Sequence, residues 1–179
     1  GGRFGKHVDL RVLAMAAVLA RKTRRPVKFQ GLRGAEYHWA RANTQSNIKM
    51  GANKEGFITA VHMKTISNFG IAHRYPATET RNIGRAPNWT WKCPNSYYEN
   101  YGVYTNISGT GPFRSFGSTQ GHYAVSQACD RLIEKLGLDP IDFYLKNHAG
   151  AGDWWEEQKQ TVSGLDDCIL KAAATIGWK

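Results

Sequence analysis

A glycine-rich stretch at residues 109–121 constrains the fold of this chain more than any other segment. It reads Gly-Thr-Gly-Pro-Phe-Arg-Ser-Phe-Gly-Ser-Thr-Gln-Gly and lies between an alternating segment and one with helical periodicity. Its glycines permit positive φ or close approach of the backbone to a ligand, and Arg114 carries a fork of donors that suits an oxygen-rich anion. The residues alone leave two interpretations open: a cradle of main-chain N–H groups, or an ordinary connection whose Phe113 and Phe116 fill the core.

A second glycine loop opens the chain as Gly1-Gly2-Arg3-Phe4-Gly5 and runs into an apolar segment at residues 8–20. The apolar residues of this segment surround the helix axis, which predicts a buried helix. A glycine loop that feeds a helix N-terminus is a general anion cradle, because the first N–H groups and the positive end of the helix dipole point outward. The glycine spacing is not that of a P-loop.

The remaining patterns predict an α+β fold in two layers, with a mixed or antiparallel sheet and helices packed on one face. Strands are expected at 26–32, 43–50, 57–67 and 101–108, an irregular segment at 71–98, and helices at 124–136, 140–147 and 163–176. The strands at 43–50 and 57–67 are expected to form a long antiparallel pair closed by residues 51–56. The helix expected at 140–147 has an unusually complete start signal, with Asp139 as N-cap and Pro140 at the first helical position. We expect residues 1–149 to form one region, and residues 150–179 a linker followed by the first helix of a further unit.

Charge and cysteine content limit the classes of function. The net charge of +10 permits a nucleic-acid-binding module whose glycine loops hold phosphate groups, but the densest basic run, residues 21–25, follows the first helix and suits its C-terminus. The three cysteines are far apart and match no zinc or iron-sulfur spacing, so we expect reduced thiols. No apolar run approaches the length of a membrane span.

Taken together, several motifs resemble the molybdenum-binding subunit of the xanthine dehydrogenase and aldehyde oxidase family. They are the first glycine loop, Ser67-Asn-Phe-Gly, Pro112-Phe-Arg-Ser-Phe-Gly-Ser-Thr-Gln-Gly, and Gly137-Leu-Asp-Pro with the following Lys146-Asn147. Their order and approximate spacing match as well, over essentially the whole chain. The resemblance implies an internal fragment of an oxidoreductase, inactive alone, with the molybdopterin-binding fold of that family across residues 1–149.

The resemblance also implies a ligand for both glycine loops, a molybdenum pyranopterin in the form of molybdopterin or its cytosine dinucleotide. Cofactor-binding positions would be Gly2, Phe4, Gly5, Phe113, Arg114 and Gly117, with the backbone of Phe4 and Arg114 beside the metal. Phe116 would stack on a flat substrate, and Arg81 and Asn82 would line the substrate pocket. The implied reaction is hydroxylation of an aldehyde or N-heterocycle with water as the oxygen source, and the family's catalytic base lies in a later segment.

Partners implied by the resemblance are 2Fe-2S and FAD domains or subunits and the remaining segments of the molybdenum subunit, in a cytoplasmic homo- or hetero-oligomer that binds no nucleic acid. Departures bear on substrate: Arg3 stands where the family commonly has glycine, and Ser115 where the carbon-monoxide-oxidising branch has cysteine. Two alternatives stay open, namely reductive dehydroxylation as in hydroxybenzoyl-CoA reductases, and a cofactor-free nucleic-acid-binding or assembly module in which Arg3 fills the pterin space.

Overall fold

The computed structural model describes residues 10–30, 41–155 and 158–178, and its centre is a three-stranded sheet of order β1-β2-β3. The strands of this sheet are β1 (Asn43–Ala52), β2 (Ile58–Asn68) and β3 (Ser96–Val103). β1 and β2 form the expected antiparallel hairpin, with Ile48 opposite Met63. β3 instead runs parallel to β2. A parallel pair needs a crossover connection, and a helix supplies it.

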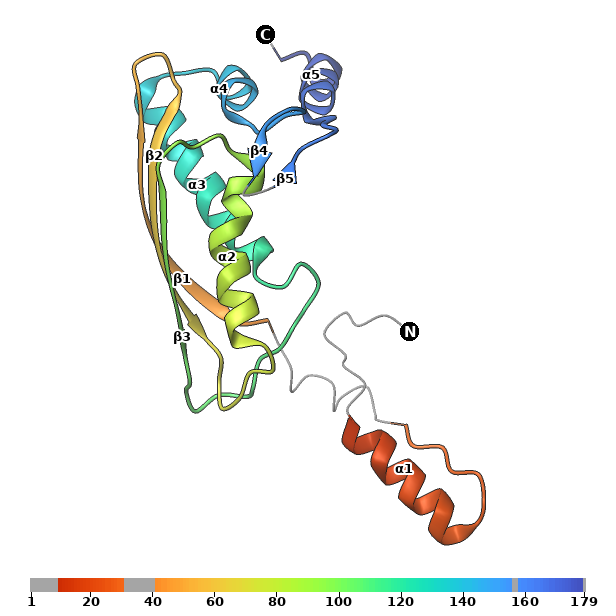
Figure 1. Ribbon diagram of the computed structural model, residues 1–179. Coiled ribbons are helices and arrows are strands. Elements are labelled where there is room, and N and C mark those ends of the chain that lie inside the picture. The colour runs from red at the N-terminus through yellow and green to blue at the C-terminus, as the bar shows by residue number, and fades with distance from the viewer. Residues whose placement is uncertain (1–9, 31–40, 156–157, 179) are drawn as a thin grey trace.

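Helices cover one face of this sheet, as Figure 1 shows. α2 (Pro76–Thr90) joins β2 to β3 and packs against β3, whereas α3 (Ser118–Leu136) packs against α2 and β1. At one end of the sheet lie α4 (Pro140–Asn147), α5 (Leu165–Ile176) and a small two-stranded sheet of β4 (Trp154–Trp155) and β5 (Gln158–Lys159). The expected two-layer α+β architecture is confirmed.

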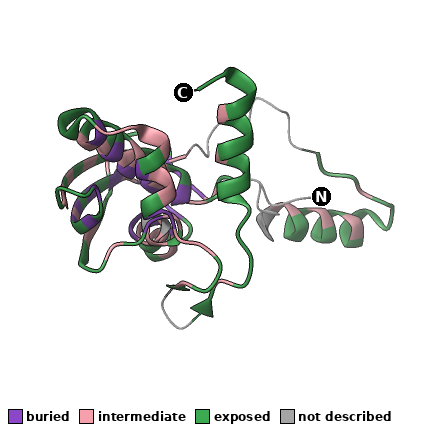
Figure 2. Ribbon diagram, turned by 90° about the horizontal axis from the view of Figure 1, so that it is seen from above, coloured by how far each residue is buried: buried purple, intermediate pink, exposed green. Residues whose placement is uncertain are grey.

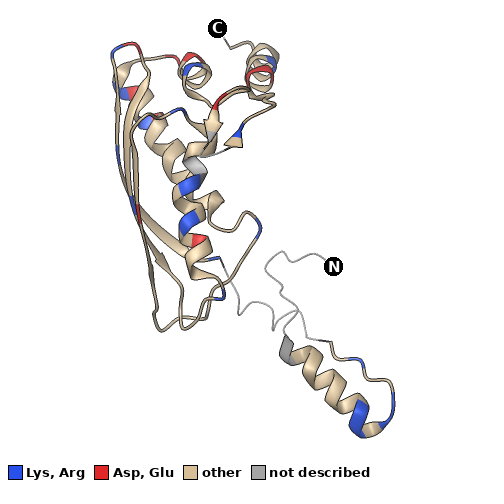
Figure 3. Ribbon diagram, in the orientation of Figure 1, with Lys and Arg blue, Asp and Glu red and all other residues tan. Residues whose placement is uncertain are grey.

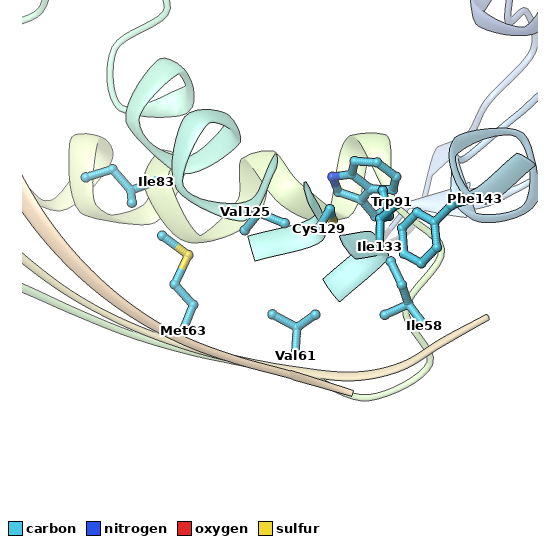
Figure 4. Close-up of a cluster of buried hydrophobic side chains, with 9 residues drawn as sticks. All are labelled: Ile58, Val61, Met63, Ile83, Trp91, Val125, Cys129, Ile133 and Phe143. Carbon is cyan, nitrogen blue, oxygen red and sulfur yellow. The ribbon is translucent and has the colours of Figure 1, made fainter. Parts of the chain in front are cut away.

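The core lies between the inner face of β2 and the two helices that cover it. Ile58, Val61 and Met63 point from β2 toward the helices (Figure 4). Val61 and Met63 follow the period of two along a strand, and Ile58 shares their side because the pairing with β1 shifts by one residue between Gly51 and Ala52. The helices and their flanking segments complete the cluster with Ile83, Trp91, Val125, Cys129, Ile133 and Phe143. Figure 2 shows the buried residues gathered in this layer, while α1 (Leu10–Thr23) and α5 are mostly exposed.

The predicted capping signals are present at α3 and α4. Gly137 ends α3 in the left-handed conformation at φ 65°. The Asp139 carboxylate accepts hydrogen bonds from the backbone N–H groups of Ile141 at 2.8 Å and Asp142 at 3.1 Å, and Pro140 opens α4. Asn147, at the other end of α4, donates to the Gly56 carbonyl at 2.7 Å and thereby fixes α4 on the β1–β2 turn.

The expectation of an irregular segment at 71–98 was wrong, because α2 occupies most of it. Pro76 is the first residue of the helix, a position where proline is favoured and loses no hydrogen bond. Gly84 lies within α2 without ending it. A Cβ at that position would lie 2.5 Å from the side-chain amide nitrogen of Asn100 on β3. Gly84 therefore permits close packing of the helix on the sheet. β3 also begins earlier than the strand expected at 101–108.

Two expectations near the N-terminus were also wrong. Residues 26–30 form no strand, and the expected strand's last residues lie outside the described part of the chain. α1 is a helix, but its apolar side chains are exposed, with Leu13 at 53% and Val18 at 61%. Figure 1 shows α1 standing apart from the sheet and its helices. The interpretation of 21–25 as a helix end is supported, since Arg21 and Lys22 lie in the last turn of α1, where Figure 3 shows basic residues in blue.

The cysteines are all free, and they differ in exposure. Cys129 is buried, Cys93 is partly buried and Cys168 is exposed on α5. Burial raises the pKa of the Cys129 thiol to about 12 and also raises the pKa of Cys93. These are the reduced thiols expected from the sequence.

Candidate functional site

The glycine-rich stretch lies at the end of the sheet that holds the C-terminal ends of β2 and β3. Because these strands are parallel, the connection from β2 to α2 and the connection from β3 to α3 meet at this end of the sheet (Figure 1). Backbone hydrogen bonds join the two connections, from the Ile71 N–H to the Ile107 carbonyl at 2.9 Å and from the Thr110 N–H to the Ala72 carbonyl at 2.9 Å. The site therefore has two walls that are distant in sequence.

Gly70 makes this close approach possible. It has φ +64°, and a Cβ at this position would lie 2.0 Å from the Ser108 carbonyl oxygen. No side chain can be accommodated against a backbone atom at that distance. The close approach of the two connections therefore explains the glycine of the Asn-Phe-Gly motif.

The backbone of the loop itself is held in an uncommon conformation. Ser115, Phe116 and Gly117 have successive φ values of 71°, 35° and 93°, and residues other than glycine rarely adopt such values without surrounding support. Two side chains supply that support. Asn82 donates to the Phe116 carbonyl at 2.9 Å, and Arg41 donates to the Arg114 carbonyl at 2.7 Å.

A network of buried side-chain hydrogen bonds lies behind the loop. Glu79, whose side chain is 1% exposed, accepts from His73 Nε2 at 2.6 Å and from Gln120 Nε2 at 3.1 Å. The Gln120 carbonyl oxygen accepts from Arg41 at 3.2 Å. His73 Nδ1 accepts from the Tyr75 N–H at 3.0 Å, so Nε2 carries the proton that is donated to Glu79.

Aromatic rings connect this hydrogen-bond network to the surface of the loop. The His73 ring lies 4.2 Å from the Phe69 ring and is stacked on Phe116, with centroids 6.1 Å apart and an interplanar angle of 11°. The guanidinium carbon of Arg41 lies 5.0 Å from the centroid of the Phe113 ring. The Phe116 ring thus packs against a buried histidine with a fixed tautomer and against the edge of the Tyr75 ring, with centroids 6.4 Å apart.

The N-terminus of α3 provides donors at the end of this loop. Gly117 is its N-cap and no side chain caps the first turn. The Ser118 N–H donates to the Ser115 carbonyl at 2.9 Å, so the N–H groups of Thr119 and Gln120 remain available to a ligand. The Arg114 side chain is exposed beside them, while its carbonyl is held by Arg41. Free N–H groups, a helix dipole and a guanidinium fit an anionic, oxygen-rich group.

The structure brings together most of the predicted site residues that it describes. Phe113, Arg114, Phe116 and Gly117 share the loop, and Asn82 reaches it from α2. Arg81, the neighbour of Asn82 on α2, is exposed. Gly2, Phe4 and Gly5 lie outside the described residues.

Sequence patterns did not point to Glu79 or Arg41. Glu79 lies in the first turn of α2, so the signal was an acidic residue three positions after a helix-opening proline. That signal was hidden because the segment was expected to be irregular. Arg41 precedes β1 and carries no motif of its own.

Among the described residues, no group of three or more His, Cys, Asp or Glu side chains could hold a metal ion. In the same part of the chain, no helix is both long and apolar enough to cross a membrane.

Comparison with known proteins identifies the family of the chain. The model of the family described as "Molybdopterin cofactor-binding domain" matches residues 1–148 of the chain. The chain belongs to the molybdopterin cofactor-binding domain family. Both glycine loops and the capped start of α4 fall within the matched region, as the resemblance implied.

Individual relatives of the chain are oxidoreductases by name. It is 33% identical over 150 residues to a probable xanthine dehydrogenase subunit of Bacillus subtilis, a match that covers 82% of the chain and 20% of the relative. It is 30% identical over 188 residues to the nicotinate dehydrogenase large molybdopterin subunit of Eubacterium barkeri, covering 100% and 44%. The chain thus spans between about a fifth and somewhat under half of these relatives.

Solved structures agree on the fold. The aldehyde oxidoreductase of Desulfovibrio gigas superposes with a TM-score of 0.79 at 27% identity, over 90% of this chain and 18% of that one. Quinoline 2-oxidoreductase from Pseudomonas putida 86 superposes with a TM-score of 0.81 at 22% identity, over 99% of this chain and 24% of that one.

Proposed function

We propose that the loop at residues 109–121 binds a molybdenum pyranopterin and that the chain serves in a molybdenum hydroxylase that oxidises an aldehyde or an N-heterocycle. The observation that carries the proposal is the uncapped N-terminus of α3 beside the exposed Arg114, on a loop whose strained backbone is held from behind. The family to which the chain belongs binds this type of cofactor.

The residues of the chain would bind the cofactor and orient it. First-turn N–H groups of α3 and the Arg114 side chain would donate to oxygen atoms of the cofactor, and Gly2, Phe4 and Gly5 would approach it from the first glycine loop. When bound, the molybdenum centre supplies the two-electron chemistry that inserts oxygen from water into a carbon–hydrogen bond. We assign no proton-transferring group to residues 1–179.

Substrate positioning would fall to the aromatic side of the loop. Phe116, supported by the stacked His73 ring, offers a flat face to a heteroaromatic ring or an aryl aldehyde. Arg81 and Asn82 are proposed to line the same pocket. Asn82 would act through the Phe116 carbonyl that it holds at 2.9 Å.

Relatives named as subunits, including the nicotinate dehydrogenase large molybdopterin subunit, support a multi-subunit assembly. We propose that 2Fe-2S and FAD domains or subunits accept the electrons in an oligomer located in the cytoplasm. The cytosine dinucleotide form of the cofactor belongs to the same proposal.

The test is metal analysis combined with pterin fluorescence on the native protein and on an Arg114→Ala variant. Because Arg41 binds the Arg114 carbonyl rather than its side chain, this substitution leaves the loop anchored. The variant should fold normally and lose molybdenum and pterin together. Arg25→Ala, which removes an exposed arginine beyond α1, is the matched control and should retain both.

Two outcomes would contradict the proposal. A correctly matured native protein without molybdenum or pterin would leave the loop without its ligand. Equal cofactor content in Arg114→Ala and in the Arg25→Ala control would remove Arg114 from the cofactor site.

A further inference from the structure

The aromatic face at Phe116 continues into a second ring and a cation. The Tyr75 ring meets the Phe116 ring at an interplanar angle of 86°, with centroids 6.4 Å apart. The guanidinium carbon of Arg74 lies 5.9 Å from the centroid of the Tyr75 ring. Tyr75 is 43% exposed, and Arg74 is exposed as well. A flat ring stacked on Phe116 would therefore lie beside Tyr75, with the Arg74 guanidinium one ring further.

The backbone that carries Arg74 and Tyr75 is fixed by the start of α2. The Tyr75 N–H donates to His73 Nδ1 at 3.0 Å, and the Tyr75 carbonyl accepts from the Glu79 N–H at 3.2 Å. Pro76 follows directly and restricts Tyr75 to extended backbone conformations. His73 and Glu79 belong to the buried hydrogen-bond network behind the loop. Arg74 is therefore attached to a part of the backbone that the site itself holds in place.

Positive charge gathers at this end of the sheet. Exposed arginines lie there, namely Arg74, Arg81 and Arg114. Figure 3 shows Lys and Arg in blue on α2 and on the adjoining connections. In residues 68–90 and 104–121 the one carboxylate is that of Glu79, which is 1% exposed and lies in the buried network. The described surface around the site therefore attracts anions.

We infer that the substrate is an aryl aldehyde or N-heterocycle that carries a carboxylate, with its ring on Phe116 and its carboxylate paired with Arg74. This inference rests on the proposed function, because it names the substrate class of the same site. A guanidinium donates two parallel hydrogen bonds to a carboxylate, and the adjacent Tyr75 ring favours a limited set of positions for it. A neutral ring makes the same contact with Phe116 but leaves Arg74 in water, so the carboxylate is the group that is discriminated.

Arg74 is assigned to the substrate, and not to the cofactor, because of its neighbours. Arg114 is the cation on the glycine loop, beside the N–H groups of α3 that are proposed to bind the cofactor. Arg74 adjoins the aromatic rings through Tyr75. If Arg74 bound a phosphate of the cofactor, its removal would release the cofactor, and the experiment separates this case.

The experiment measures steady-state oxidation by the native, full-length protein, with a dye as the electron acceptor. It uses matched pairs of compounds, pyridine-3-carboxylate with pyridine-3-carboxamide and 4-carboxybenzaldehyde with methyl 4-formylbenzoate. The kcat/KM of each acid should exceed that of its neutral partner by about 10- to 100-fold. Arg74→Gln should remove most of this difference by raising KM for the acids with kcat unchanged, whereas Arg74→Lys should keep part of it.

Binding without turnover gives a second readout. Benzoate and benzamide, which have neither an aldehyde nor a ring nitrogen, serve as ligands in isothermal titration calorimetry. Arg74→Gln should weaken the binding of benzoate by about 10- to 100-fold and leave that of benzamide unchanged. Arg131→Gln, at an exposed arginine of α3 outside the loop, is the matched control and should change neither the binding nor the kinetics.

The inference is overturned if native protein that contains molybdenum and pterin oxidises the neutral compounds at least as well as the acids. It is also overturned if Arg74→Gln keeps the full preference for acids, or if that variant loses molybdenum and pterin, since Arg74 would then serve the cofactor. These results differ from failure of the proposed function, in which the native protein itself lacks molybdenum and pterin and the inference falls with it.

Discussion

Substitution of Glu79 by glutamine tests which groups donate and which accept in the buried hydrogen-bond network behind the loop. Glu79 accepts hydrogen bonds from both His73 and Gln120, and a glutamine side chain has one acceptor and one donor end. One of these two donors would then face the new amide N–H group.

Neither His73 nor Gln120 can become an acceptor toward the new amide without losing another hydrogen bond. His73 cannot move its proton to Nδ1, because that atom accepts from the Tyr75 N–H. Gln120 cannot turn its amide, because its oxygen accepts from Arg41. The cost is that of a lost charge-assisted hydrogen bond with a buried donor left unpaired, about 1.5–3 kcal/mol.

Urea denaturation followed by circular dichroism and tryptophan fluorescence measures this cost. Glu79→Gln should lower the free energy of unfolding by this amount. Glu79→Ala leaves both His73 and Gln120 without an acceptor and should lower it by about 2–6 kcal/mol, that is about 1–3 kcal/mol for each buried donor left unpaired. Glu134→Gln on the exposed face of α3 is the control and should stay within about 0.5 kcal/mol. If Glu79→Gln behaves like Glu134→Gln, the donors and acceptors of this hydrogen-bond network are not the ones described.

Three further substitutions or titrations examine other contacts. Gly117→Ala should destabilise the protein by about 2–4 kcal/mol in urea unfolding, because its Cβ would lie 2.5 Å from a backbone carbonyl of α2 at φ +93°; Gly137→Ala, with φ +65° and nothing within 4 Å, should cost only about 1–2 kcal/mol. The Trp178 indole N–H holds the pKa of Asp139 below its ordinary value of 3.8. This contact should therefore contribute stability above that value and be lost as pH falls through the lowered pKa, and the indole N–H resonance of Trp178 should follow that midpoint and become insensitive in Asp139→Asn. Phe143→Ala should lower the free energy of unfolding by about 3–5 kcal/mol, because the side chain is 1% exposed in the main cluster; a loss below about 1 kcal/mol would contradict its place in the core.

Local signals in the sequence predicted those elements whose ends carry specific caps. The end of α3 and both ends of α4 were expected correctly, because Gly137, Asp139 and Pro140 act within a few residues of these helix ends. The start of α3 carries no such signal, and the helix begins at Ser118, six residues before its expected start. The β1–β2 hairpin was expected because two strand-like segments with apolar residues flank a turn at residues 51–56 that begins and ends with glycine. Each of these signals depends on neighbours in the sequence, which is why they could be recognised without the fold.

Elements that depend on distant contacts were missed. The packing of Gly84 against β3 is known only from the fold, so α2 was not expected within residues 71–98, and the parallel pair of a mixed sheet could not be assigned to β2 and β3. The burial of α1 was overestimated, because an apolar periodicity predicts a helix and says nothing about what covers it. At the site, the motif residues Arg114 and Gly117 were identifiable, but Glu79 and Arg41 join them only through the fold.

The unequal exposure of the three cysteines makes the unaltered chain suitable for labelling at a single position. Maleimide reagents react with thiolates, and the raised pKa values of Cys129 and Cys93 keep those thiols protonated at neutral pH. Cys168 is exposed on α5, at the end of the sheet where α4 also lies. A dye attached there would give a fixed reference point for fluorescence energy transfer to a fluorescent ligand bound near Arg114.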